Sequence, residues 1–138
     1  MFKIKVDDLI HKYPDGTQAL SGANIDVKEG EFLAILGANG SGKTTLLKHF
    51  NGLLKPASGS VTLDNKALSA FKSGEVFRKV GMVFQDPSDQ LIAPTVEEDV
   101  AFGPTNLGLN YDETMSRVNT ALELVKMKEF AKKAIHAL

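Results

Sequence analysis

A glycine-rich octapeptide constrains this 138-residue chain more than any other part of it. Residues 37–44 read Gly-Ala-Asn-Gly-Ser-Gly-Lys-Thr and satisfy the pattern G-x-x-x-x-G-K-[ST] at every fixed position. Glycines let backbone N–H groups approach and turn around a phosphate, so a loop of this kind cradles the phosphates of a nucleotide. The alternative, an ordinary glycine-rich turn with an exposed lysine, seldom matches the whole pattern by chance. The octapeptide therefore predicts a nucleotide-binding site.

Individual residues of this loop have separate expected roles. Lys43 should reach the β- and γ-phosphates, the Thr44 hydroxyl should bind Mg²⁺, and Thr45 could direct a hydroxyl toward the α-phosphate. The helix that the loop opens would add partial positive charge at the anion. The predicted nucleotide-binding residues of this segment are Gly37, Ala38, Asn39, Gly40, Ser41, Gly42, Lys43, Thr44 and Thr45.

The segments around the loop predict a parallel sheet. Residues 32–36 and 80–84 are apolar without alternation, which is typical of strands buried on both faces of a parallel sheet. Residues 44–51 should form the helix that follows the loop, and Gly52 can lie just beyond its end.

Shorter signals predict an antiparallel part. Residues 2–6 alternate between apolar and polar, and residues 19–27 form a second strand after a turn at 13–16. Residues 61–63 add a short strand.

Beyond Pro87 the pattern becomes helical. Residues 95–98, Thr-Val-Glu-Glu, form a capping box, and Gly103-Pro104 should end the helix that it begins. Asp112 can cap a longer helix, and a further segment places three apolar residues on one face. The apolar residues of these two helices are Met115, Val118, Leu122 and Val125, and then Phe130, Ala134 and Leu138.

The predicted fold is therefore α/β: a P-loop NTPase core with an antiparallel β subdomain and a helical subdomain. We place the β subdomain and the core at residues 1–86 and the helical subdomain at 87–138, and we expect the fold to be incomplete at its C-terminus.

Composition excludes several classes of protein. Sixteen Lys+Arg against 17 Asp+Glu give a net charge of −1, so no basic field predicts a nucleic-acid partner. The absence of cysteine excludes a disulfide framework and a thiol nucleophile. No apolar run approaches the ~18 residues of a membrane span, and no signal-peptide core is found. His11, His49 and His136 show no metal-binding spacing, so we expect them at the surface or at helix ends.

Two further residues are candidates for the site. Gln85 follows the predicted strand 80–84, at the edge where open α/β sheets bind ligands, and could contact Mg²⁺ and orient a water. From its position alone it could equally be a solvated loop residue. Tyr13 precedes a turn and could stack on adenine, although a lone aromatic residue there more often packs against the turn.

Several of these segments together resemble the ATP-binding subunits of ABC transporters. They are Tyr13-Pro14, the glycine-rich loop, Asn51-Gly52-Leu53-Leu54-Lys55-Pro56, Ser58-Gly59 and Val83-Phe84-Gln85-Asp86-Pro87. Residues 89–104, followed by Asn106-Leu107, are similar to the ATPases of energy-coupling-factor importers, including the cobalt and nickel group.

The resemblance implies roles, cofactors and partners. Tyr13 becomes the adenine-stacking residue, and Gln85 becomes the Q-loop glutamine, a catalytic residue together with Lys43 and a Mg²⁺ ligand together with Thr44. ATP and Mg²⁺ are the implied cofactors. The implied partners are a second ATPase subunit and a transmembrane coupling subunit that docks near residues 85–94 at the cytoplasmic face of the membrane. The cargo, a metal ion or a vitamin, is selected by membrane subunits.

One departure from the family bears on activity. The family continues with an LSGGQ-like signature, a Walker B strand ending in Asp-Glu and a switch histidine, and residues 1–138 contain none of them. We therefore expect the chain to hold the N-terminal half of the machine, completed by a separate chain or truncated, and to be unable to hydrolyse ATP alone. Two alternatives remain open: a non-catalytic nucleotide-binding or docking module, and a small P-loop phosphotransferase.

Overall fold

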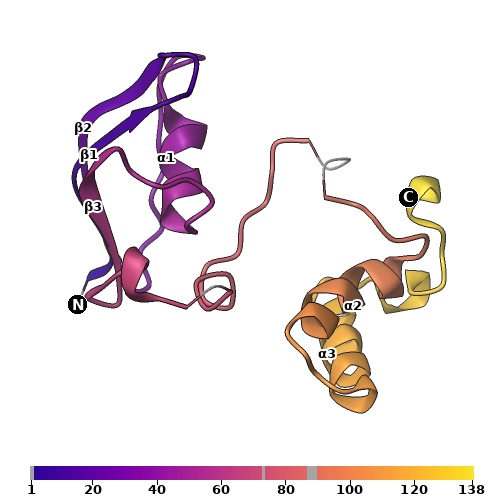
Figure 1. Cartoon of the computed structure of the whole chain (residues 1–138). Coiled ribbons are helices and arrows are strands. Elements are labelled where there is room, and N and C mark those ends of the chain that lie inside the picture. The colour runs from indigo at the N-terminus through magenta and orange to yellow at the C-terminus, as the bar shows by residue number, and fades with distance from the viewer. Residues whose placement is uncertain (1, 73, 87–89) are drawn as a thin grey trace. The chain divides into compact units, whose positions relative to one another are not determined.

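A computed structural model describes residues 2–72, 74–86 and 90–138 of the chain (Figure 1). The chain divides into two compact units, Met1–Met82 and Val83–Leu138, and each has an apolar core of its own. No helix in the described ranges is both long and apolar enough to cross a membrane.

The first unit is built on an antiparallel sheet of four strands in the order β2-β1-β3-β4. These strands are β1 (Phe2–Lys12), β2 (Gln18–Lys28), β3 (Ser58–Leu63) and β4 (Lys66–Ala67), and a short 3₁₀ turn, η1 (Leu68–Ala70), follows. The predicted antiparallel strands are confirmed, as is the turn between the first two. There the Gly16 N–H donates to the Tyr13 carbonyl at 2.9 Å, and Gly16 takes a φ of 89°.

An irregularity in β1 changes which of its side chains face the core. The register with β2 shifts between Val6 and Leu9, and Asp8 takes a φ of 45°. Val6 and Leu9 are therefore both buried although they lie three residues apart, and His11 continues the inward phase of Leu9.

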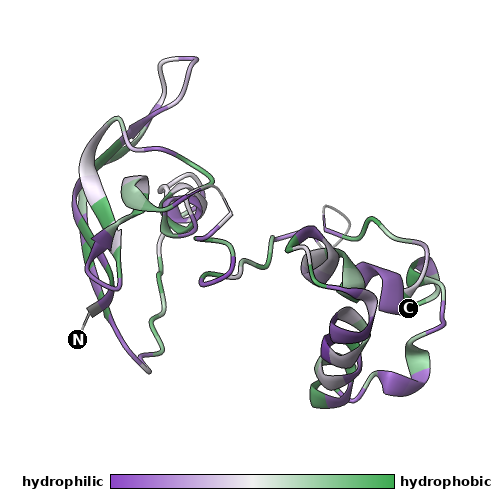
Figure 2. Cartoon of the chain, turned by 60° about the horizontal axis from the view of Figure 1, so that its bottom comes forward, coloured by the Kyte–Doolittle hydropathy of each residue, from purple (hydrophilic) through white to green (hydrophobic). Residues whose placement is uncertain are grey.

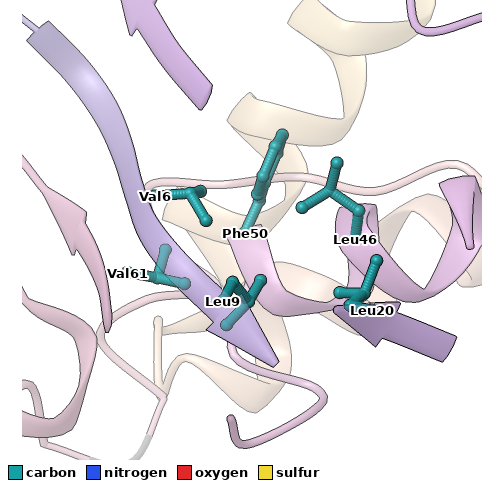
Figure 3. Close-up of a cluster of buried hydrophobic side chains, with 6 residues drawn as sticks. All are labelled: Val6, Leu9, Leu20, Leu46, Phe50 and Val61. Atoms are coloured by element: carbon teal, nitrogen blue, oxygen red, sulfur yellow. The ribbon is translucent and has the colours of Figure 1, made fainter. Parts of the chain in front are cut away.

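Helix α1 (Lys43–Phe50) packs against one face of this sheet (Figure 1). Leu46 and Phe50 lie one helical turn apart and meet apolar side chains from three strands (Figure 3). The core consists of Val6, Leu9, Leu20, Leu46, Phe50 and Val61. The helix predicted at 44–51 is thus confirmed to within a residue at each end, and Gly52 follows it at φ 77°.

The two predicted parallel strands are not formed, and this prediction is wrong. Residues 32–36 and 80–84 are in neither a helix nor a strand, and Phe32, Leu36 and Val83 are 96%, 89% and 88% exposed. A buried parallel strand depends on neighbouring strands for its hydrogen bonds and on helices for its cover. In the part of the chain that the structure describes, no strand pairs with either segment.

The second unit consists mainly of α2 (Val96–Asn106) and α3 (Tyr111–Leu124), with short 3₁₀ turns η3 (Lys128–Phe130) and η4 (Ile135–Ala137). Both helices carry apolar and polar residues (Figure 2), and their apolar faces meet at a small core of Val96, Val118 and Leu122. The predicted capping box is confirmed: the Thr95 hydroxyl accepts from the Glu98 N–H, and the Glu98 carboxylate accepts from the Thr95 N–H.

Two predicted helix ends in this unit are wrong, the end of α2 and the cap of α3. Helix α2 continues through Gly103-Pro104 to Asn106: Pro104 lies in the last turn, where its missing N–H removes one helical bond only, and the Gly103 carbonyl still accepts from the Leu107 N–H at 3.1 Å. The cap of α3 is Asn110 rather than Asp112, since the Asn110 Oδ1 accepts from the Glu113 N–H at 2.9 Å.

The segment predicted as a last helix forms short turns instead. The carbonyls of Ala131 and Lys133 accept from the first N–H groups of α2, those of Glu97 and Val96. Because these carbonyls are already bound, they are not available to a continuous helix through residues 130–138.

A matched pair of glycines tests the irregularity in β1. Gly59 and Gly16 both have a φ above 80°, but a Cβ at Gly59 would overlap the carbonyl oxygens of Asp7 and Asp8, whereas one at Gly16 would meet nothing within 4 Å. We expect Gly16→Ala to destabilise the chain by ~1 kcal/mol through backbone strain, and Gly59→Ala to add a further ~1–3 kcal/mol through overlap. Urea unfolding followed by circular dichroism measures both, and equal losses would contradict the assigned contact.

Candidate nucleotide-binding site

The glycine-rich loop leads directly into α1, and it is held close to the sheet. Gly40 and Gly42 have φ values of 80° and 88°, which favour glycine. A Cβ at Gly42 would lie 2.5 Å from the Ala19 carbonyl oxygen on β2. Gly42 is thus required both for its conformation and for the close approach between loop and strand.

The N-terminus of α1 differs from those of α2 and α3. No side chain caps it and its first turn has no acidic residue, whereas α2 and α3 each have a capping side chain and acidic residues in the first turn. The first N–H groups of a helix have no partner within the helix, and the helix dipole adds partial positive charge there. The beginning of α1 is therefore suited to an external anion, such as a phosphate.

The Lys43 side chain folds back over the loop. Its Nζ donates to the carbonyl oxygens of Gly37 and Ala38, at 2.9 and 2.8 Å. The ammonium thus lies at the mouth of the loop, and a phosphate oxygen would compete with two neutral carbonyls for it. Since bonds between charged partners are the stronger ones, this arrangement favours exchange of the carbonyls for an anion.

Tyr13 and Thr45 are brought together although they lie 32 residues apart. The Tyr13 hydroxyl and the Thr45 Oγ1 are 3.0 Å apart in a hydrogen bond. Tyr13 follows the end of β1, and Thr45 is a buried residue of the first turn of α1. The predicted base-stacking residue is therefore adjacent to the predicted phosphate-binding helix.

The next feature is the predicted Mg²⁺ site. Among the residues that the structure describes, no group of three histidine or acidic side chains is placed to hold a metal ion. The Thr44 hydroxyl is in an exposed residue at the start of α1. Mg²⁺ usually keeps several waters and takes only one or two protein ligands beside the phosphates of a nucleotide, so a single hydroxyl is compatible with it.

Gln85 is an exposed residue of the second unit, whereas the loop belongs to the first. Its place near the nucleotide remains a prediction.

In the predicted docking segment, 85–94, residues 87–89 lie outside the described residues. Leu91 and Ile92 are exposed, and the backbone N–H groups of Ile92 and Ala93 donate to the Asp99 carboxylate at 2.9 and 3.1 Å.

Sequence reasoning missed a pair of buried histidines beside Tyr13. The expectation of surface or helix-end histidines holds for His136, which is exposed, and for His49, which lies in the last turn of α1, but it is wrong for His11, which lies in β1. The burial of His11 and His49, 7% and 0% exposed, was not predicted. The irregularity in β1, which is visible only in the structure, turns His11 inward. For His49 the sequence did carry a signal, because the residue lies one helical turn from Thr45 on the buried face of α1.

The three rings form a chain of edge-to-face contacts. The ring centroids of His11 and His49 lie 4.8 Å apart at 70°, and those of His11 and Tyr13 lie 4.6 Å apart at 81°. In the described structure neither ring nitrogen of His11 has a hydrogen-bond partner, and the polar group that acts on the His49 ring is the Leu54 backbone. Burial lowers the pKa of His49, a positive charge on His11 would lower that pKa further, and the Leu54 backbone opposes both.

The fold is shared with solved ATP-binding cassettes. One is cbiO1 from Clostridium perfringens, whose structure is described as part of the ABC transporter complex cbiONQ, with a TM-score of 0.85 and 43% identity over 99% of this chain and 55% of that one. Another is the ATP-binding cassette MJ0796 in a dimeric post-hydrolysis state bound to ADP and Pi, with a TM-score of 0.81 and 29% identity over 98% of this chain and 62% of that one. The chain thus has the fold of an ABC ATPase.

Sequence comparison gives the same class. The family described as ABC transporter matches residues 20–138, and this chain belongs to that family. It is 49% identical to the energy-coupling factor transporter ATP-binding protein EcfA of Methanosphaera stadtmanae, over 98% of this chain and 49% of that protein. It is also 49% identical to the EcfA of Methanocaldococcus jannaschii, over 100% of this chain and 50% of that protein. The chain spans about half the length of the curated relatives it matches.

The buried histidines predict how stability depends on pH. The folded state lowers the pKa of His49 below its ordinary value near 6.5, so the unfolded state binds protons more readily on acidification. We expect the free energy of unfolding to be highest above pH 6.5 and to fall as the pH drops below it. Urea unfolding between pH 7.5 and 5.5 should show this fall in the wild type and a smaller one in His49→Phe. Identical slopes would contradict the role of His49.

Proposed function

We propose that this chain binds ATP with Mg²⁺ through residues 37–45. The observation that carries the proposal is the start of α1: it is the one α-helix of the described chain with neither a capping side chain nor an acidic first turn, and it follows a complete phosphate-loop motif. Lys43 would hold the β- and γ-phosphates in place of two loop carbonyls. The Thr44 hydroxyl would be a ligand of Mg²⁺, which neutralises phosphate charge when bound.

The base and the α-phosphate would be bound by a second pair of residues. Tyr13 is at the end of β1, and its hydroxyl bonds to Thr45. We propose that the Tyr13 ring stacks on adenine and that Thr45 bonds to the α-phosphate. The contact between them fixes the ring at one end of the loop, so that base and phosphates are recognised together.

We further propose that the chain is the ATP-binding part of an energy-coupling-factor type importer at the cytoplasmic face of a membrane. The support is 49% identity to two proteins named EcfA, together with the likeness to cbiO1. Residues 1–86 would supply the β subdomain and the phosphate loop, and residues 87–138 would supply the helical subdomain. A second ATPase subunit and a transmembrane subunit would be its partners, and the cargo would be a metal ion such as cobalt or nickel, or a vitamin.

In this proposal the chain contributes nucleotide binding, and hydrolysis needs further groups. Gln85 would contact Mg²⁺ and orient the attacking water, and Lys43 would stabilise the charge on the transferred phosphoryl group. The acidic residue that polarises the water would come from outside these 138 residues, in the same protein or in another chain.

The loop assignment predicts the behaviour of two lysine variants of α1. Lys43→Ala removes the cation at the mouth of the loop, and we expect it to weaken Mg²⁺–ATP binding ~10- to 100-fold, as loss of a charge-assisted contact does. Lys48→Ala removes a lysine from the last turn of the same helix and should leave the affinity unchanged. Isothermal titration calorimetry on both folded variants tests the assignment, and equal affinities would overturn it.

The segment after Gln85 would be the docking site of the transmembrane subunit. Leu91 and Ile92 expose apolar side chains in a loop whose backbone is tied to Asp99 at the start of α2. Exposed apolar groups on a positioned loop favour a protein partner over water. An amphipathic helix of the membrane subunit would cover them with its apolar face.

Two leucine variants test this docking site. In a full-length ATPase carrying these residues, Leu91→Asp would put a charge into the interface, and we expect co-purification with the membrane subunit to fall at least 10-fold. Leu124→Asp, on an exposed leucine at the end of α3, is the matched control and should assemble normally. ATP affinity should be unchanged in both variants. Normal assembly of folded Leu91→Asp would show that the partner docks elsewhere.

A further inference from the structure

The buried histidine pair has no place in the roles described so far. His11 comes from β1 and His49 from the buried face of α1, so their contact joins the sheet to the helix that the loop opens. Apolar side chains at these positions would fill the core without burying polar ring nitrogens, of which those of His11 have no hydrogen-bond partner in the described structure. Since an unbonded buried polar group costs free energy, two adjacent imidazoles point to a role beyond packing.

The pair supports the Tyr13 ring, whereas Thr45 contacts the Tyr13 hydroxyl. The His11 ring lies edge-on to the Tyr13 ring, and the fully buried His49 ring lies edge-on to His11. Tyr13 is therefore held at two places, its hydroxyl by Thr45 and its ring by His11. Without the His11 ring, one of these two supports is lost and the tyrosine ring gains freedom.

We propose that His11 and His49 are positioning residues that hold Tyr13 ready for the nucleotide base while both rings are neutral, and that a proton on the pair releases this hold. The inference rests on the proposed function, because it takes Tyr13 to be the base-stacking residue. It adds that affinity for the base, unlike affinity for the phosphates, decreases on acidification.

The surroundings of the pair disfavour a positive charge. From β2 the neighbour opposite His11 in the register is Leu20, which carries no charge, and the neighbour beyond β1 is the neutral phenol of Tyr13. Lys55 and Lys72 line the same surface hollow as His49. Because His49 is fully buried and its ring lies 4.8 Å from that of His11, a proton taken up by the pair favours its separation.

The experiment compares two ligands that share a triphosphate chain, only one of which carries a nucleoside. Mg²⁺–ATP and inorganic Mg²⁺–tripolyphosphate are titrated into the 138-residue chain by calorimetry, and the ratio of their affinities reports what the nucleoside, base and ribose together, adds to the phosphate contacts. We expect His11→Ala to lower this ratio ~2- to 10-fold, as loss of an edge-to-face pair does, with tripolyphosphate affinity unchanged. His11→Phe keeps a ring edge at Tyr13 and should restore the ratio at pH 7.5.

The pH profile separates positioning from simple packing. Between pH 7.5 and 5.5 the ratio of the two affinities should fall in the wild type. In His11→Phe it should fall less, because only one imidazole remains in the pair. His136→Ala, which removes an exposed histidine of the second unit, should behave as wild type. Titration of the phosphates themselves is a property of the ligands, so it is the same for every variant and cancels when the wild-type and variant ratios are compared at one pH.

The possible failures can be told apart. Equal affinity for Mg²⁺–ATP in Lys43→Ala and in the wild type overturns the proposed function and this inference with it. Binding that needs Lys43, with the same ratio in folded His11→Ala as in wild type, or with no dependence of the ratio on pH, overturns the inference alone. If His11→Ala does not fold, the wild-type and His11→Phe profiles decide: parallel profiles overturn the inference.

Discussion

The packing of α1 on the antiparallel sheet is the interaction on which the candidate site depends. Leu46 and Phe50 anchor the helix in a core built from three strands, and this fixes the direction of its N-terminus. The close approach of Gly42 to β2 then holds the end of the loop against the sheet. Because α1 begins without a cap, this positioned N-terminus keeps its polar groups available to a phosphate. Fold and site thus share one physical origin, the amphipathic face of a short helix.

The same face of α1 connects the loop to Tyr13, the residue that we propose to stack on the base. Thr45 and His49 lie one turn apart on it, and through them the helix contacts both ends of the short segment His11–Tyr13. The Thr45 contact is a hydrogen bond between two hydroxyl groups, and it holds Tyr13 without the involvement of a histidine. At the histidine contact, burial of His49 opposes a positive charge, and in our proposal this makes the support of Tyr13 conditional on pH. One helix face would then connect phosphate binding, base binding and a response to acid.

Two exposed apolar segments, residues 32–36 and 80–84, have no strand partner within the described residues. Phe32, Leu36 and Val83 have strand-like sequence around them but no strand beside them. An antiparallel strand can be completed by a nearby hairpin partner, as β1 is by β2, whereas parallel strands require partners that arrive through longer crossovers. Local sequence is thus sufficient for the β subdomain and insufficient for the parallel core, which is consistent with a chain that spans about half of its relatives' length.

The sequence by itself determined the glycine-rich loop, α1, the antiparallel strands and the capping box at Thr95, because these depend on local backbone conformation and on short-range patterns. It also supplied Tyr13 as a candidate, although not its contact with Thr45. Only the tertiary structure decided that His11 and His49 are buried together. Their contact depends on a local irregularity at Asp8 that reverses the inward phase of β1, and on the packing of a helix 38 residues further along the chain. It also decided that residues 32–36 remain unpaired, since whether a strand forms depends on its neighbours as well as on its own residues.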